Sequence, residues 1–145
     1  GWVLLTFTER MTREEIIIKI KGKNNEYVVK AINGLERKYG KRFYTKFKTI
    51  TFDNGREFSG HQTIARILKA KCYFAKPYHS WERGLNEHTN GLLRQFIPKK
   101  TNFKYVTDED IAKYQNLINN RPRKILNYNT PIEVFTSIQT VALRN

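Results

Sequence analysis

The sequence predicts an α/β domain in which helices cover the faces of a mixed β-sheet. Short β-branched and apolar runs near residues 2–8 and 15–21 are separated by a polar turn, as in two neighbouring strands. Two further apolar runs, KTITF at 48–52 and CYFA at 72–75, each precede a pattern typical of a helix start. The resulting order, β-β-α-β-α-β-α-α, is typical of a mixed sheet with helices on its faces. A chain of 145 residues can bury one core and is too short for two comfortable domains.

Apolar periodicity and capping residues place the helices. They are expected at 25–40, from Ser59 onward, at 81–97 and at 108–120. Ser59 with Gln62 three residues later resembles a capping box. Thr107 is a suitable N-cap for the last helix, and Pro98 and Pro122 end the two helices that precede them.

The charge balance predicts a polyanionic partner. Lys and Arg number 27 against 13 for Asp and Glu, a net charge of +14, and nucleic acid is the polyanion that such a chain most often meets. No apolar run approaches the roughly 20 residues that span a bilayer, so we expect no membrane association. Cys72 is the single cysteine, which precludes an internal disulfide and suits the reducing cytoplasm.

Asp53 stands where the apolar run 48–52 ends, in TFDNGREF. A carboxylate there could be a turn residue, an ion-pair partner or a metal ligand, and Asp-Asn-Gly is typical of a hairpin turn. A hairpin needs a second strand at once, whereas Arg56–Ser59 lead into a helix start. Between Arg37 and Thr107 there are sixteen basic residues and four acids, so an acid in this region is unusual. These observations favour a metal-site role for Asp53.

The segment WERGLNEHTNGLLRQF, 81–96, carries a second acid. On a helix, one face would hold Arg83, Glu87, Asn90 and Arg94, and the other would hold Trp81, Leu85, Leu92 and Phe96. An ordinary solvated helix with an Arg–Glu pair could show the same pattern. Gly84 and Gly91 each cost about 1 kcal/mol relative to Ala inside a helix, which indicates close approach of a phosphodiester backbone or of another helix.

Asp53 and Glu87 together suggest phosphodiester chemistry. Carboxylates hold Mg²⁺ through few protein oxygens and leave coordination positions for phosphate and water. Two such ions, about 4 Å apart, can activate a nucleophile and stabilise the leaving oxygen. Nearby Arg and Lys side chains would neutralise the substrate backbone.

Three long motifs give the chain a specific resemblance. TFDNGREFSGH, YFAKPYHSWERGLNEHTNGLLRQFIPKKTNF and NNRPRKILNYNTPIEVF resemble the catalytic core of bacterial insertion-sequence transposases of the DDE class, in the insertion-sequence-thirty family. The resemblance implies a ribonuclease-H-like fold over residues 1–136, followed by a tail at 137–145. It also implies cleavage of DNA at transposon ends and strand transfer to a target, with two Mg²⁺ or Mn²⁺ ions. A dimer or higher oligomer on DNA, in the bacterial cytoplasm and at the nucleoid, is expected.

Site residues follow from the resemblance by position. Asp53 resembles the second acid of the catalytic triad and Glu87 the third. DNA-contacting residues are expected in the segment after Asp53, in the helix that carries Glu87 and in the loop before that helix. They are Arg56, Lys76, Tyr78, His79, Arg83, Asn90 and Arg94. His79 could alternatively be a capping or surface histidine, and either role is favoured over that of a metal ligand.

The first acid of the family's triad lies on a strand that would precede this chain. We therefore expect the chain to lack the first core strand, to have an incomplete metal site, and to bind DNA while catalysing poorly. Glu9 resembles an ordinary residue of the family at its position and is not expected to substitute. The family's end-recognising helix-turn-helix region is not expected in this piece either.

Other interpretations stay open at this point. A noncatalytic DNA-binding remnant or domesticated module would need the same charge and much of the same fold, and a nuclease of the same fold would cleave without joining. The basic, aromatic segment 37–48 could track a DNA backbone and stack on bases. It could as well be a solvated loop whose aromatic rings enter the core. RPRK, 121–124, could contact DNA or a partner subunit, or simply pack.

Overall fold

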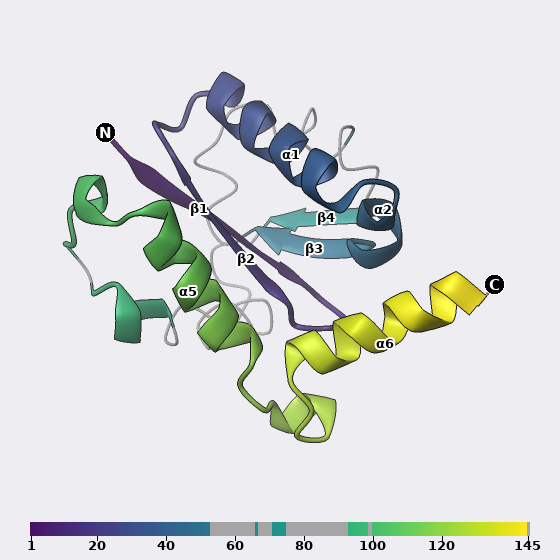
Figure 1. Ribbon diagram of the computed structural model, residues 1–145. Coiled ribbons are helices and arrows are strands. Elements are labelled where there is room, and N and C mark those ends of the chain that lie inside the picture. Colours follow the sequence, from purple (N-terminus) through teal and green to yellow (C-terminus); the bar gives the residue numbers. More distant parts are fainter. Residues whose placement is uncertain (53–65, 67–70, 75–92, 99, 145) are drawn as a thin grey trace.

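The structure, a computed structural model, describes residues 1–52, 66, 71–74, 93–98 and 100–144. Its centre is a four-stranded sheet built from β1 (Val3–Glu9), β2 (Glu15–Ile20), β3 (Thr49–Phe52) and β4 (Lys71–Phe74) (Figure 1). The strand order is β2-β1-β3-β4. The pairs β1–β2 and β1–β3 are antiparallel, and β3–β4 is parallel. The expected mixed sheet is confirmed.

The contact between β1 and β3 is short. β1 pairs with β2 at six positions but with β3 at three, from Phe7↔Phe52 to Glu9↔Ile50. A hydrogen bond from the backbone N–H of Arg10 to the carbonyl of Thr49, 2.8 Å, continues this pairing by one residue. β3 therefore pairs with the last three residues of β1, Phe7 to Glu9.

One face of the sheet packs against α1 (Asn25–Tyr39), α2 (Arg42–Lys46) and α6 (Pro131–Arg144). The alternation of each strand sends Leu5 and Phe7 of β1 to this face, together with Ile16 of β2. The helices contribute Val28, Ile32, Leu35, Phe43, Phe47 and Phe135, all buried.

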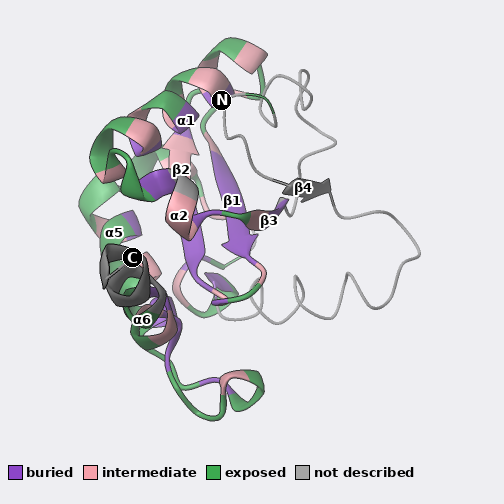
Figure 2. Ribbon diagram, turned by 90° about the vertical axis from the view of Figure 1, so that its right-hand side faces the viewer, coloured by how far each residue is buried: buried purple, intermediate pink, exposed green. Residues whose placement is uncertain are grey.

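The opposite face is covered by α5 (Asp108–Asn119) and by the segment from Leu93 to Val106. Leu4 and Ile17 point to this side and pack with Ile111 and Ile118 of α5. Figure 2 shows the buried residues concentrated in β1 and β2, with the exposed ones on the outer sides of the helices. The chain thus forms three layers, helices on both faces of one sheet.

Two amide side chains of α5 satisfy the outer edge of β2. Asn119 accepts a hydrogen bond from the backbone N–H of Glu15 (2.8 Å) and donates to its carbonyl (2.8 Å), and Gln115 accepts from the N–H of Ile17 (2.9 Å). Four residues of helix rise about 6 Å and two residues of strand about 6.6 Å, so the two spacings match. The side chains replace the strand that this edge would otherwise recruit.

Replacing Asn119 by alanine should lower the free energy of unfolding by about 2–4 kcal/mol, because a buried N–H and a buried carbonyl of Glu15 both lose their partner. Urea denaturation followed by circular dichroism measures this loss. Asn120→Ala is the matched control, since the neighbouring amide is exposed and its described hydrogen bonds go to Asn116 of the same helix. Equal losses for the two variants would contradict the edge-capping role.

The strands and the first and last expected helices agree with the sequence prediction within two residues. Thr107 caps α5 as expected, in a capping box with Asp110. The helix expected after Ser59 and most of the one at 81–97 lie outside the described residues. The prediction lacked α2, and it lacked α6, which continues without a break past the expected boundary after residue 136. Within the described residues, no helix has both the length and the apolarity to cross a bilayer.

Candidate functional site

The described residues include the strand that precedes Asp53 but neither of the two expected catalytic acids. Asp53 and Glu87 lie outside them, as do Arg56, Lys76, Tyr78, His79, Arg83 and Asn90. Arg94 alone among the expected site residues is described. The roles assigned to these side chains therefore stay predictions.

The sheet topology aligns the starting points of two expected site segments. β3 and β4 run parallel, and their last residues, Phe52 and Phe74, are register partners. Asp53 follows Phe52 in the sequence, and the segment holding Lys76 follows Phe74. The two strands thus end side by side, and the ends of parallel strands are where α/β proteins build their sites.

Glu9 belongs to a different part of the sheet. Its carboxylate accepts hydrogen bonds from the backbone N–H groups of Met11 and Thr49, both 3.0 Å. Thr49 begins β3, whereas Phe52 ends it. Burial raises the pKa of the Glu9 carboxyl, and the backbone hydrogen bonds oppose that rise. Glu9 therefore closes the β1–β2 turn and holds the start of β3.

Arg94 lies on the exposed side of the described helical turn 93–96. Leu93 and Ile97, four residues apart, are buried on the other side. Phe96 stacks on Tyr114 of α5 with a centroid separation of 5.2 Å. The guanidinium of Arg94 makes one long contact, 3.4 Å, to the carbonyl of Ile97. The buried residues of this turn are Leu93 and Ile97, whereas the predicted apolar face is represented among the described residues by Phe96, which is half-buried against Tyr114.

Three aromatic residues of segment 37–48, Tyr39, Phe43 and Phe47, pack in the core. Phe43 and Phe47 are buried and lie 4.9 Å apart between ring centroids, and Tyr39 contacts Phe47 edge-on. Stacking on bases is thereby excluded for Phe43 and Phe47, because no base can reach a buried ring. The rings of Phe43 and Phe47 enter the core, as the alternative interpretation expected, but the segment is not a loop, since it holds the end of α1 and all of α2. Of its basic residues, Lys46 is half-buried and the others are exposed: Arg37, Lys38, Lys41, Arg42 and Lys48.

A buried polar cluster joins β2 to α5, and sequence reasoning did not anticipate it. Glu15 is fully buried and accepts a hydrogen bond from the Thr8 hydroxyl. Arg123 is buried beside it and donates to the carbonyl of Ile118 at 2.9 Å. Burial lowers the pKa of Arg123, and the Glu15 carboxylate opposes this change. The second arginine of the RPRK motif is therefore a packing residue.

Glu14 extends this cluster toward α2. Burial raises the pKa of its carboxyl to about 7, and the Lys46 ammonium opposes the rise only in part. Lys46 in turn lies 3.7 Å from the ring centroid of Phe135. In the described part of the chain, no three His, Cys, Asp or Glu side chains are grouped as metal ligands would be.

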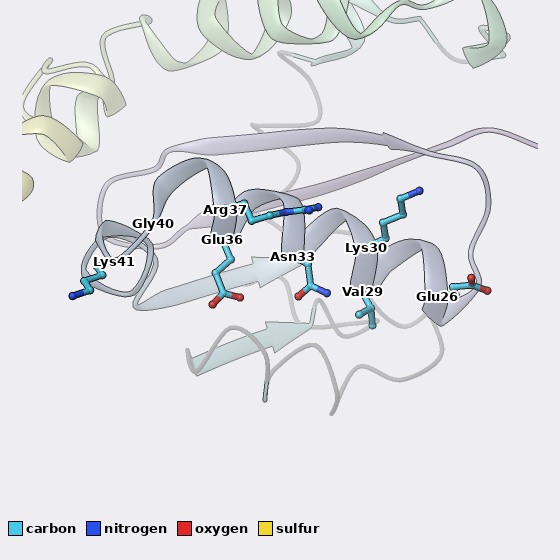
Figure 3. A pocket seen from close by; sticks show the side chains of 8 residues that line it. All are labelled: Glu26, Val29, Lys30, Asn33, Glu36, Arg37, Gly40 and Lys41. Carbon is cyan, nitrogen blue, oxygen red and sulfur yellow. The ribbon is translucent and has the colours of Figure 1, made fainter.

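A shallow hollow of about 880 Å³ follows the outer side of α1 (Figure 3). Its lining mixes acids, Glu26 and Glu36, with Lys30, Arg37 and Lys41. Figure 3 shows Glu36 and Lys30 pointing to different sides of the helix. Charges that alternate along a helix are typical of a solvated face, so the hollow offers no catalytic constellation.

Comparison with known proteins matches the chain to transposases. It is 48% identical over 135 residues to the transposase for insertion sequence element IS4351 of Bacteroides fragilis, covering 93% of the chain and 40% of the relative. It is 35% identical over 131 residues to transposase InsI for insertion sequence element IS30A of Escherichia coli K12, covering 90% and 33%. The resemblance to insertion-sequence transposases of the IS30 family is confirmed. The chain spans 40% of the length of the first of these transposases and 33% of the second. No family model matches.

Solved structures confirm the ribonuclease-H-like fold of this transposase-like chain. The catalytic core domain of BIV integrase matches with a TM-score of 0.63 at 15% identity, covering 98% of the chain and 97% of the integrase domain. A chain in the simian T-cell lymphotropic virus intasome structure, in complex with PP2A regulatory subunit B56 gamma, also matches with a TM-score of 0.63. It is 18% identical, with 92% of this chain and 48% of that chain covered. At such identities the likeness concerns the fold.

Proposed function

We propose that this chain is the catalytic core of a DNA transposase that cleaves DNA at transposon ends and joins the freed strand to a target. The observation that carries the proposal is the parallel β3–β4 register, Phe52↔Phe74, which starts two motif-bearing segments at one edge of the sheet. The transposase relatives supply the reaction class. The proposed partner is DNA, on which copies of the protein assemble as a dimer or higher oligomer. The proposed location is the bacterial cytoplasm, at the nucleoid.

Asp53 and Glu87 are the proposed metal ligands. Their carboxylates are the hard oxygen donors that Mg²⁺ and Mn²⁺ take, so the donor set fits the ion by its chemistry. When bound, the two ions supply activation of the attacking oxygen and stabilisation of the leaving one. Arg83, Arg94 and Asn90 bind and orient the phosphodiester backbone in this proposal, with Arg56, Lys76, Tyr78 and His79 lining the path of the DNA.

A third carboxylate is proposed to come from residues encoded upstream of Gly1. Glu9 does not supply it, because its carboxylate holds the Met11 and Thr49 backbone at the start of β3. The 145-residue chain alone is accordingly expected to bind DNA and to cleave it poorly.

The reaction products test the proposal. The chain, and a longer version that includes the upstream residues, are incubated with transposon-end DNA, target DNA and Mg²⁺, and the products are separated on a denaturing gel. Joined strands from the longer version support a transposase, and nicked strands alone would indicate a nuclease. DNA binding by the longer version without any product would indicate a noncatalytic module. Robust Mg²⁺-dependent nicking by the 145-residue chain would contradict the incomplete metal site.

A further inference from the structure

The loop that follows α5, residues 121–129, projects from the body of the molecule, below α5 and α6 in Figure 1. Figure 2 shows it extending from the lower end of the helical layer. It contains a single 3₁₀ turn, η3 (Lys124–Leu126), and connects α5 to α6.

Backbone hydrogen bonds close this loop on itself. The N–H of Arg123 donates to the carbonyl of Asn129 (3.0 Å), and the N–H of Tyr128 donates to the carbonyl of Arg123 (2.8 Å). The Arg123 side chain is buried and fixes the base of the loop to the end of α5. Thr130 and Glu133 then form a capping box that starts α6. The loop is therefore held at both ends.

Its two large apolar side chains contribute little to the fold. Ile125 and Tyr128 are each 69% exposed, among the most exposed large hydrophobic residues described. Tyr128 also has φ of 65°, and Asn127 before it has φ of 53°. This left-handed region costs a non-glycine residue free energy, and a bulky aromatic residue there is rare. Exposure and strain in a closed loop indicate that these side chains serve a contact made outside the chain.

The charge around the loop identifies the partner. Arg121 and Lys124 are exposed, and no acidic residue occurs between Asp110 and Glu133. Arg121 donates to Gln95 at 2.9 Å, which joins the loop to the turn that carries Arg94. Basic residues beside apolar ones suit DNA, whose phosphates take the cations while the rings and methyl groups contact sugars and bases. A second copy would bring two basic loops together and is disfavoured by repulsion.

We propose that the 121–129 loop is a second DNA-contacting surface, in which Arg121 and Lys124 hold phosphates and Ile125 and Tyr128 contact the exposed sugar and base edges. The loop extends the proposed DNA path beyond Arg94. This inference rests on the proposed function for the identity of the polyanion, although it requires no strand cleavage.

Fluorescence anisotropy with a labelled DNA duplex tests the loop. In the 145-residue chain, Ile125→Ser with Tyr128→Gly should weaken DNA binding about tenfold, in the range seen when aromatic contacts to bases are lost. The melting temperature should be unchanged or higher, since glycine relieves the strained φ. Lys124→Gln should lower the slope of log K against log salt concentration by about one.

Tyr105→Ser is the matched control, because Tyr105 is 76% exposed but precedes α5, at the helix end away from the loop. It should leave DNA affinity unchanged. Unaltered DNA affinity in the Ile125/Tyr128 variant would overturn the proposal. If analytical ultracentrifugation showed in addition a changed oligomeric state, the loop would be a contact between copies of the chain instead. Absence of strand joining would count against the proposed function alone, because the loop is tested by binding.

Discussion

Asp53→Asn, in the longer version of the protein, is expected to reduce DNA cleavage and strand joining by about 1000-fold. Asparagine keeps the size of the side chain but loses the charge that would hold a divalent ion. A metal ion contributes several kcal/mol to the stabilisation of charge in the transition state, and each 1.4 kcal/mol corresponds to tenfold in rate. Glu87→Gln should have the same effect for the same reason. A strand-transfer assay with labelled transposon-end DNA measures both losses.

DNA binding separates this effect from misfolding. Both variants should bind the end DNA as well as the parent protein does, because the positive charges that bind phosphate are retained. Glu109→Gln is the control, since Glu109 is an exposed acid in the first turn of α5. Full joining activity in Asp53→Asn would remove Asp53 from the metal site. Lost binding together with lost joining would assign it a structural role.

Stability should decrease as the pH rises from about 5 to 8, chiefly through Glu14. Burial raises the pKa of this carboxyl from 4.5 to about 7, so the folded state holds a proton that the unfolded state has released. Where the folded state binds more protons, the free energy of unfolding falls with rising pH, here by on the order of 3 kcal/mol. Burial also raises the pKa of Glu9, which acts in the same direction.

Glu14→Gln should remove most of this pH dependence. Glutamine can keep the 3.4 Å contact with Asn119 and carries no charge at pH 8, so the variant should be more stable than the parent chain there. Among the described residues, Lys46 and Tyr39 interact electrostatically with Glu14. Urea denaturation at pH 5 and pH 8 measures the difference. Glu26→Gln, at an exposed position, should keep the parent's pH profile, and an unchanged profile in Glu14→Gln would refute the assignment.

Local patterns were sufficient for most of the secondary structure. The strands are short β-branched runs, and Thr107 with Asp110 marks the start of α5 through contacts three residues apart. α2 escaped prediction because five residues, Arg42–Lys46, are too few to show a helical period. The sequence suits Phe43 and Phe47 equally to stacking on bases or to a core. The packing of Phe47 against Phe7 and Phe135, with Phe43 beside it, decides for the core.

The sequence likewise predicts one part of the site region and misses another. Long motifs predict Asp53 and Glu87 as site residues, and this stays a prediction because both lie outside the described residues. The structure shows that β3 ends at Phe52, paired with Phe74 of β4. The buried cluster of Glu14, Glu15 and Arg123 could not be read from the sequence. Charged residues are normally expected at the surface, so the sequence gives no sign that these three are buried. They are buried because α5 lies against β2. The RPRK motif therefore combines an inward Arg123 with outward neighbours, a distinction that the sequence does not carry.

The edge contact between Asn119 and Glu15 has a consequence for the order of folding. These residues are 104 positions apart, so the contact closes a very long loop of chain. Contacts of such separation form slowly, because the chain entropy is lost before the contact is gained. During synthesis, the β1–β2 hairpin must wait, with its outer edge open, until α5 has left the ribosome. The interval exposes an aggregation-prone strand edge, and premature termination before residue 119 should yield insoluble fragments.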